Sequence, residues 1–261
     1  MALTTSEHQV LLAEREAPST LYYGVLGSLV VYDNNRIATP TAPKAARVLA
    51  ILLLRANHLV LASSLIDEIW GERPPPSAAS TLQTYIYHLR CALGRNVIET
   101  HPRGYSLALG QADFDLFQFR SRVGQGRRLL ALGRPHDALA ELRAGLSLWR
   151  GESLNNLPAG DILQPYIAQL DEERRRATQL RVEAEFVAGY HRELIGELKM
   201  LVSDDPYNEW LHARLIEALS LSGRRRDALS AYESLRKLLA EHLGLEPTQE
   251  LRDLERRVLG S

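Results

Sequence analysis

A seven-residue motif that occurs twice in the second half of the chain constrains its fold most strongly. The pattern Gly-x-x-x-Asp-Ala-Leu covers residues 133–139 and again residues 223–229, and a looser copy begins at Gly189. In such a motif the glycine stands in the turn between two paired helices, and the alanine lets the helices approach closely. We therefore expect stacked helical hairpins in this part of the chain.

The 34 residues between Gly189 and Gly223 are the period of the tetratricopeptide repeat. Asp205-Pro206 and Glu246-Pro247 stand where the next helices of such a stack should begin. The first two glycines are 56 residues apart, and a loop over residues 151–160 accounts for part of this break in the period. We predict two or three helical hairpins, closed by a terminal helix over residues 248–259.

Residues 21–110 differ, because short β-rich runs surround three helical segments. The predicted order is strands over residues 21–26, 29–32 and 36–39, helices over residues 43–57, 65–70 and 80–93, and a hairpin of strands over residues 97–100 and 105–109. Asp33-Asn34-Asn35 is a strong turn signal. Ser63 or Ser64 can cap the second helix, and Ser77 or Ser80 can begin the third. This order predicts a winged helix-turn-helix, so the whole chain is expected to be mainly α with a small β component.

The composition is that of an ordinary globular protein, with 45% hydrophobic and 24% charged residues. Residues 1–20 are more acidic than basic, unlike a secretory signal, and we expect them to form a flexible leader. The longest apolar run, residues 48–54, is too short to span a membrane. A single cysteine, Cys91, allows neither an internal disulfide nor a cysteine zinc site. We expect a cytoplasmic protein with no membrane partner.

Several short motifs in a fixed order resemble one family. In the first half they are Pro43-Lys44-x-x-Arg47-x-Leu49, Leu65-Ile66-Asp67-x-Ile69-Trp70-Gly71, Pro74-Pro75-Pro76, Thr81-Leu82-Gln83-Thr84-Tyr85-Ile86-x-x-Leu89-Arg90 and Gly104-Tyr105. In the second half they are LWRG at residues 148–151 and LGLEP at 243–247. From about residue 21 to residue 259 the chain resembles the Streptomyces antibiotic regulatory proteins, which activate secondary-metabolite gene clusters. The resemblance implies a small two-domain member, with an OmpR-type winged-helix domain over residues 21–110 and a bacterial transcriptional activator domain, tetratricopeptide-like, over residues 111–261.

The resemblance also implies partners. It implies a sequence-specific activator, associated with the nucleoid, that binds directly repeated sites in double-stranded promoter DNA as a homodimer. It implies that the exposed loop from Glu72 to Pro76 and its neighbours contact the sigma subunit of RNA polymerase. The alternative for this loop is a stiff connector that sets the angle between two helices.

The helix predicted over residues 80–93 carries the candidate DNA-reading side chains. An apolar stripe of Leu82, Ile86, Leu89 and Leu93 would anchor it to the core. By position in OmpR-type domains, Thr84 and His88 would face bases, and the side chains that would hold phosphates are Ser80, Thr81, Tyr85 and Arg90. The alternative is an ordinary amphipathic helix whose polar face meets only solvent.

Cations are few near this helix. Arg95 follows it. Arg103 lies at the tip of the predicted hairpin, where an arginine can enter a narrow minor groove or stay solvated. Lys44 lies near the start of the first helix, where it could touch a phosphate or meet only water. Residues 21–110 carry eight Lys/Arg and five Asp/Glu, and the relatives usually have one or more arginines on this helix face. We therefore expect modest electrostatic affinity for DNA, with binding dependent on dimerisation or on polymerase.

Enzymatic chemistry is not indicated. The chain has no phosphate-binding glycine loop and no His-Glu-x-x-His zinc helix. Cys91 and His88 share a helix face, but no third group completes a nucleophilic arrangement. We predict no catalytic residue, no metal ligand and no cofactor, and we assign Trp70 to core packing rather than to base stacking. Two alternatives to an activator remain: a protein-interaction scaffold with a non-specific or vestigial winged helix, and a repressor of the same architecture.

Overall fold

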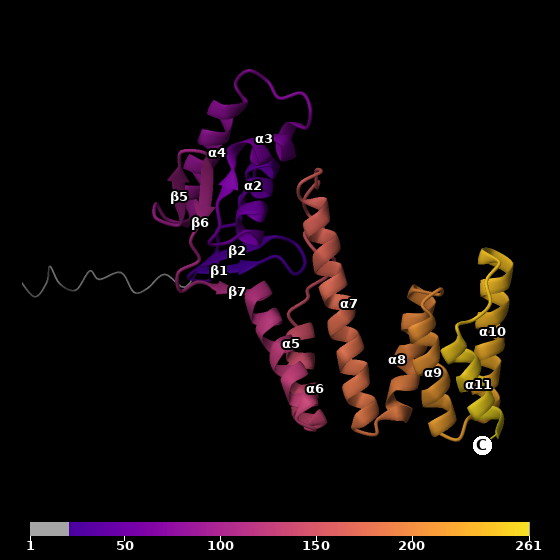
Figure 1. The fold of residues 1–261 in the computed structure, drawn as a ribbon. Helices are drawn as coiled ribbons and strands as arrows, with labels where there is room; N and C mark the ends of the chain where they lie inside the picture. Colours follow the sequence, from indigo (N-terminus) through magenta and orange to yellow (C-terminus); the bar gives the residue numbers. More distant parts are fainter. Residues whose placement is uncertain (1–20, 261) are drawn as a thin grey trace, which may run out of the picture. The chain divides into compact units, whose positions relative to one another are not determined.

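A computed structural model describes residues 21–260, so the leader predicted over residues 1–20 lies outside the described residues. By contact, the chain divides into two compact units. Of the described residues, the first contains 21–123 and 144–176, and the second contains 124–143 and 177–260. The fold is mainly α with a small β component, which confirms the prediction (Figure 1). No helix among the described residues has the length and apolar character of a membrane span.

A four-stranded sheet opens the first unit, in the order β3-β2-β1-β7. β1 (Leu21–Gly24) pairs antiparallel with β2 (Val30–Asp33), which pairs antiparallel with β3 (Arg36–Ile37). The predicted turn is confirmed, because Asn34 and Asn35 adopt φ values of 46° and 64°, a conformation that asparagine tolerates better than most residues. β7 (Asp113–Phe114) pairs parallel with β1, and the sequence pattern does not predict this two-residue strand.

Three helices and a second sheet complete the predicted winged helix-turn-helix. α2 (Pro43–Leu54) begins with proline and buries eight of its residues. α3 (Ala62–Trp70) and α4 (Ala78–Leu93) both pack against α2. β4 (Val60–Leu61), β6 (Gly104–Leu107) and β5 (Ile98–His101) form a sheet in that order, and the β5–β6 hairpin is the wing.

The predicted serine cap of α3 is wrong. The helix begins at Ala62 directly after Leu61, and no side chain caps it. Because β4 pairs with β6, the backbone stays extended up to Leu61, and the Ala62 amide donates to the Arg103 carbonyl oxygen at 3.0 Å. A backbone group of the wing thus satisfies an amide that would otherwise need a cap, and Ser63 and Ser64 lie inside the first turn.

Three helical hairpins follow, as the glycine motif predicts. They join α5 (Asp115–Ala131) to α6 (Pro135–Leu146), α7 (Gln164–Val187) to α8 (His191–Asp204), and α9 (Glu209–Leu221) to α10 (Arg225–Leu243). Gly133, Gly189 and Gly223 stand in the three turns with φ values of 68°, 86° and 76°, where an L side chain would be strained. α11 (Gln249–Gly260) is the predicted terminal helix.

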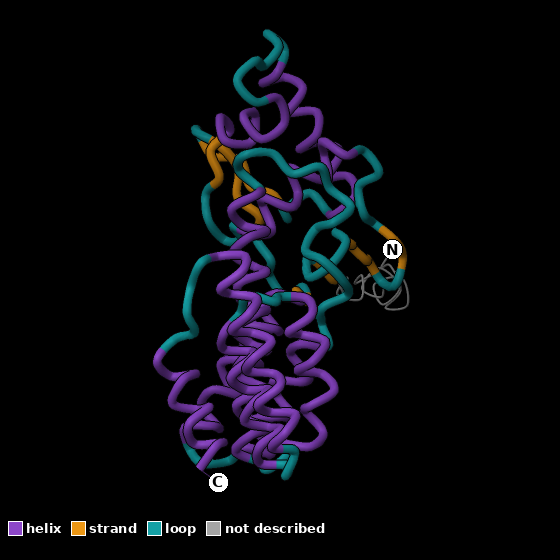
Figure 2. Tube along the Cα trace, turned by 90° about the vertical axis from the view of Figure 1, so that its right-hand side faces the viewer, coloured by secondary structure: helices purple, strands orange, loops and turns teal. Residues whose placement is uncertain are grey.

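A continuous apolar core holds the second unit together. α9 contacts both α8 and α10, as the labelled helices of Figure 1 show, and Figure 2 shows that this part of the chain is built of helices joined by loops. Leu198 of α8, Ala218 of α9 and Leu235 of α10 are fully buried in this core. Ala228, also fully buried, is the alanine of the repeated motif, and its small side chain lets the helices approach closely.

Candidate nucleic-acid interface

α4 has one buried face and one exposed face, as its sequence predicts. Leu82, Ile86, Leu89 and Leu93 are all at most 5% exposed and anchor the helix to the core. The opposite face exposes the predicted residues Ser80, Thr84 and His88, together with Tyr87 and Cys91. Thr81 and Tyr85 are half-buried at the edge of this face. The exposed face is therefore polar and continuous, with Tyr87 as its most exposed aromatic side chain at 63%.

The hydroxyl groups on this face are already oriented by the helix. Ser77 occupies the N-cap position of α4 without a side-chain capping bond, and the Ser80 hydroxyl donates to the Ser77 carbonyl oxygen at 2.9 Å. The Thr84 hydroxyl donates to the Ser80 carbonyl oxygen at 3.1 Å. Because its proton is used within the helix, Thr84 presents oxygen lone pairs and a methyl group outward. These groups suit an exocyclic amine of a base or the methyl group of thymine.

Arg90 joins α4 to the wing. Its Nε and Nη2 atoms donate to the Ile98 carbonyl oxygen at 2.9 and 2.8 Å, and Nη2 also donates to the Thr100 hydroxyl at 2.7 Å. Arg90 is half-buried, and these bonds set the position of strand β5 relative to α4. Its predicted phosphate contact stays a prediction, and two of the three guanidinium nitrogens are already used within the fold.

The wing presents a cation at its tip. Arg103 is exposed in the two-residue turn between β5 and β6, and Arg95 is exposed in the turn that precedes β5. The adjacent Gly104 has no room for a side chain, because a Cβ atom there would lie 1.9 Å from the Val60 carbonyl oxygen. The close approach of β4 and β6 therefore depends on glycine beside the exposed arginine.

Lys44 and Tyr85 meet at Trp70. The Lys44 ammonium lies 5.1 Å from the centre of the Trp70 ring, and the Tyr85 ring stacks on Trp70 at 6.4 Å with an interplanar angle of 19°. Trp70 is only half-buried, so it packs against these two side chains rather than deep in the core. The structure thus brings together two predicted phosphate-binding residues from α2 and α4.

Glu68 forms a buried junction that the sequence pattern does not predict. Its fully buried carboxylate pairs with Arg47 at 2.9 Å, and Arg47 also donates to the Glu68 carbonyl oxygen. The carboxylate accepts the amides of Gly160, Ile162 and Leu163 at 2.7, 3.0 and 2.9 Å, just before α7 begins. The acid therefore caps the start of α7 from α3, and Arg47 is occupied by an internal ion pair.

Asp115 forms a second buried junction. It is fully buried, accepts the amides of Val25 and Leu26 at 3.0 Å, and pairs with Arg150 at 3.0 Å. Burial raises the pKa of Asp115, while the hydrogen bonds from these two amides and the neighbouring Arg150 act in the opposite direction. The sequence indicates this junction only through Arg150, which belongs to the LWRG motif.

The loop before α7 is also fastened to the first sheet. The Ser28 hydroxyl donates to the Asn155 side chain at 2.7 Å, and the Leu29 amide donates to the Asn156 side chain at 2.8 Å. The segment that interrupts the glycine period is therefore an ordered part of the first unit. Among residues 21–260 no cluster of three or more potential metal-ligating side chains occurs.

Comparison with known proteins points to transcriptional regulators. Residues 38–107 match the family model of the C-terminal domain of transcriptional regulatory proteins, and residues 114–259 match that of the bacterial transcriptional activator domain. The chain is 36% identical to regulatory protein DnrI of Streptomyces peucetius over 246 residues, which cover 90% of each protein. It is 33% identical to regulatory protein AfsR of Streptomyces coelicolor, covering 95% of this chain but 25% of AfsR.

A solved structure is also similar. Mycobacterium tuberculosis EmbR, in complex with a low-affinity phosphopeptide, superimposes with a TM-score of 0.88 at 34% identity, covering 93% of this chain and 65% of that one. The chain thus spans about two thirds of EmbR and most of DnrI.

Proposed function

The chain belongs to the Streptomyces antibiotic regulatory protein family of transcriptional regulators, and from this membership we propose that it is a pathway-specific activator of a secondary-metabolite gene cluster. It binds directly repeated sites in promoter DNA and recruits RNA polymerase. The single observation that best supports this proposal is the polar, exposed face of α4 beside a wing that ends in Arg103.

In the proposed complex α4 lies in the major groove, which is wide enough for a helix. Thr84 and His88 face base edges. The phosphates are held by Ser80, Thr81, Tyr85, Lys44 and Arg95. Arg90 adds a phosphate contact through the guanidinium nitrogen that its bonds to β5 do not use. Arg103 reaches the adjacent minor groove, where the negative potential is deepest.

The small number of cations sets the expected mode of binding. The exposed cations among the predicted contacts are Arg95, Arg103 and Lys44. Arg47 is not counted among them, because it forms an internal ion pair with Glu68. Few phosphate contacts give low affinity for one copy and a shallow dependence on salt. Two copies on direct repeats raise the affinity by effective concentration. This supports a homodimer on DNA as the active form.

The loop from Glu72 to Pro76 is the proposed contact with the sigma subunit. All five of its residues are exposed, and three consecutive prolines reduce the entropy lost when a partner orders the loop. The loop joins α3 to α4, so a polymerase bound there lies close to the DNA-reading helix.

Footprinting on the promoter of the operon adjacent to the gene tests the proposal. The wild-type protein is expected to protect two direct repeats, with protection extended by added polymerase. Thr84→Ala combined with Arg103→Ala should abolish the specific footprint. Arg36→Ala combined with Ser121→Ala, two exposed changes away from α4 and the wing, is the matched control and should leave it intact.

One alternative has its own support. The cation-poor face of α4 favours a protein-interaction scaffold whose winged helix binds DNA only non-specifically. Binding that is lost at moderate salt on every sequence, and that is unchanged in the Thr84/Arg103 double variant, would favour this alternative. Protection that overlaps the promoter and reduces transcription would instead indicate a repressor.

A further inference from the structure

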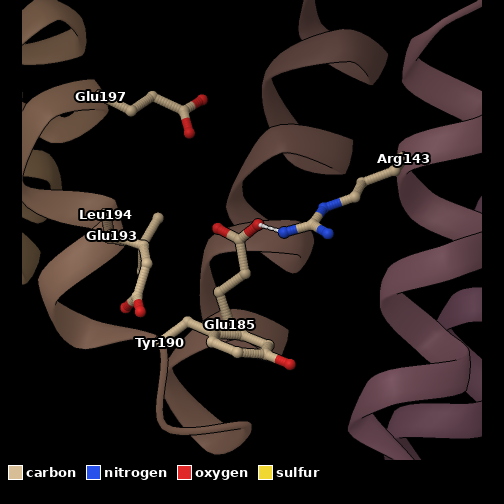
Figure 3. Close-up of a pocket in the computed structure, with 6 residues that line it drawn as sticks. All are labelled: Arg143, Glu185, Tyr190, Glu193, Leu194 and Glu197. Carbon is tan, nitrogen blue, oxygen red and sulfur yellow. Dashed lines mark hydrogen bonds and ion pairs between the residues drawn. The ribbon is translucent and has the colours of Figure 1, made fainter.

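The second unit contains a cavity that plays no part in the proposed DNA interface. It has a volume of about 390 Å³ and is lined by Arg143 of α6, Glu185 of α7, Tyr190 of the α7–α8 turn, and Glu193, Leu194 and Glu197 of α8. Figure 3 shows the side chains of Glu185, Tyr190, Glu193 and Glu197 around the space between these helices. A volume of this size accommodates a small organic molecule.

Of the three glutamates that line the cavity, two form ion pairs with arginines. Glu185, whose side chain is only 4% exposed, pairs with Arg143 at 2.7 Å and with the buried Arg181 at 2.8 Å. Arg181 also pairs with both carboxylate oxygens of Glu197. Because these carboxylates are used within the fold, the network fixes the wall of the cavity and leaves it close to neutral.

Glu193 is the acid that remains unbalanced. Among the described residues no hydrogen bond or ion pair neutralises its exposed carboxylate. It lies three residues after Tyr190, in the first turn of α8. The cavity therefore carries one negative charge beyond its internal pairs.

An aromatic ring is the second, independent feature. Tyr190 is 36% exposed, and its ring meets His136 edge-on at 5.9 Å, while the Tyr190 hydroxyl lies 3.4 Å from the His136 Nδ1 atom. These contacts hold the ring in place with part of its surface turned to solvent. A fixed aromatic face attracts a cation through its quadrupole, and Leu194 adds buried apolar surface.

We propose that this cavity binds a small organic cation, an ammonium or guanidinium group carried on a short apolar body. The charged group lies between the Glu193 carboxylate and the Tyr190 ring, and the apolar body contacts Leu194. The same chemistry is available from a free amine and from a lysine or arginine side chain of a partner protein. The volume of the cavity favours the free amine.

Calorimetric titration of the full chain without DNA tests the proposal. The probes are phenethylamine, its neutral analogue 2-phenylethanol and its anionic analogue 3-phenylpropionate, which have similar shape and different charge. We expect the amine to bind at least about tenfold more tightly than either analogue, because a charge-assisted contact is lost in both. N-acetyl-lysine and N-acetyl-arginine methylamides form the second arm, and tighter binding of these would identify a partner side chain as the source.

Variants separate the two features. Glu193→Gln should weaken amine binding about tenfold, and Tyr190→Leu should weaken it while Tyr190→Phe retains it. Glu183→Gln, an exposed acid on α7 outside the cavity, is the control and should change nothing. Equal binding of all three probes, or equal behaviour of the Glu193 and Glu183 variants, would overturn the proposal. Because no DNA is present, this outcome is independent of the regulatory function.

Discussion

Glu68 and Gly160 are 92 residues apart, and the Gly160 amide donates a 2.7 Å hydrogen bond to the buried Glu68 carboxylate. The same carboxylate accepts two further amides and pairs with Arg47. A single acidic side chain on α3 thus organises the start of α7.

Replacement of Glu68 should therefore destabilise the first unit. Glu68→Ala leaves Arg47 without its partner and three amides without their acceptor, and we expect a loss of about 3–5 kcal/mol in the free energy of unfolding. Glu68→Gln, which keeps one acceptor, should lose less. Urea denaturation followed by circular dichroism measures both. Glu72→Gln, at an exposed acid, is the control, and a loss under about 1 kcal/mol in Glu68→Ala would contradict the assigned role.

Gly104 gives a second prediction, about the wing. A Cβ atom there meets the Val60 carbonyl oxygen and the Leu61 Cα atom, both of which are backbone, so Gly104→Ala should force β4 and β6 apart. We expect a loss of about 1–3 kcal/mol and weaker DNA binding. Gly196→Ala is the matched control. Gly196 lies inside α8 with no heavy atom near an added Cβ, so the change should stabilise the protein by roughly 0.5–1 kcal/mol. Equal effects of the two changes in thermal denaturation would refute this account of the wing.

Tyr23 gives a prediction about alkaline pH. Its side chain is fully buried, and burial raises the pKa of its hydroxyl from 10.0 to about 12. The neutral form is favoured in the folded state, so this contribution to stability is complete below pH 10 and is lost as the pH rises toward 12. Relative to Tyr23→Phe, the free energy of unfolding of the wild type should fall by about 1.4 kcal/mol per pH unit in this window.

At pH 7 the same variant should be no less stable than the wild type, because the Tyr23 hydroxyl has no hydrogen-bond partner among the described residues. Urea denaturation at pH 7, 10 and 11 measures the difference. A difference in the free energy of unfolding between the two proteins that stays constant from pH 7 to pH 11 would show that burial does not raise the pKa of Tyr23.

Thr84 and Arg103 should affect DNA binding in different ways. Thr84→Ala removes a group that we propose faces a base, so we expect about 1–3 kcal/mol less discrimination at one base-pair position. Arg103→Ala should weaken binding to every sequence and reduce the salt slope by about one. Fluorescence anisotropy at several salt concentrations, on a specific and a scrambled site, distinguishes the two. A Thr84→Ala effect that is the same on both sites would remove the assigned base contact.

The sequence predicts those parts of the fold that depend on local pattern. The apolar stripe of α4 from Leu82 to Leu93 and the turn glycines such as Gly133 are visible because their spacing repeats within a few residues. The DNA-facing positions follow from the same spacing together with the family motifs, and their roles stay predictions.

What the sequence does not predict depends on distant partners. β7 is too short to show a pattern, and it exists because β1 offers it an edge. The roles of Glu68 and Asp115 depend on groups about 90 residues away, so neither acid stands out from surface acids. α3 lacks a serine cap because the wing supplies the bond.

The anchoring of the segment before α7 has a consequence for recombination between related genes. A fragment that ends at residue 110 retains Glu68 but loses the three amides that it caps, and it also loses Asp115, which holds the Val25 and Leu26 amides. A productive crossover that transplants the winged-helix domain between relatives must therefore carry the residues through the start of α7, or exchange both ends of each buried junction together. In chimaeras joined at residue 110, Glu68 and the amides that it accepts would come from different parents, and so would Asp115 and its amide partners.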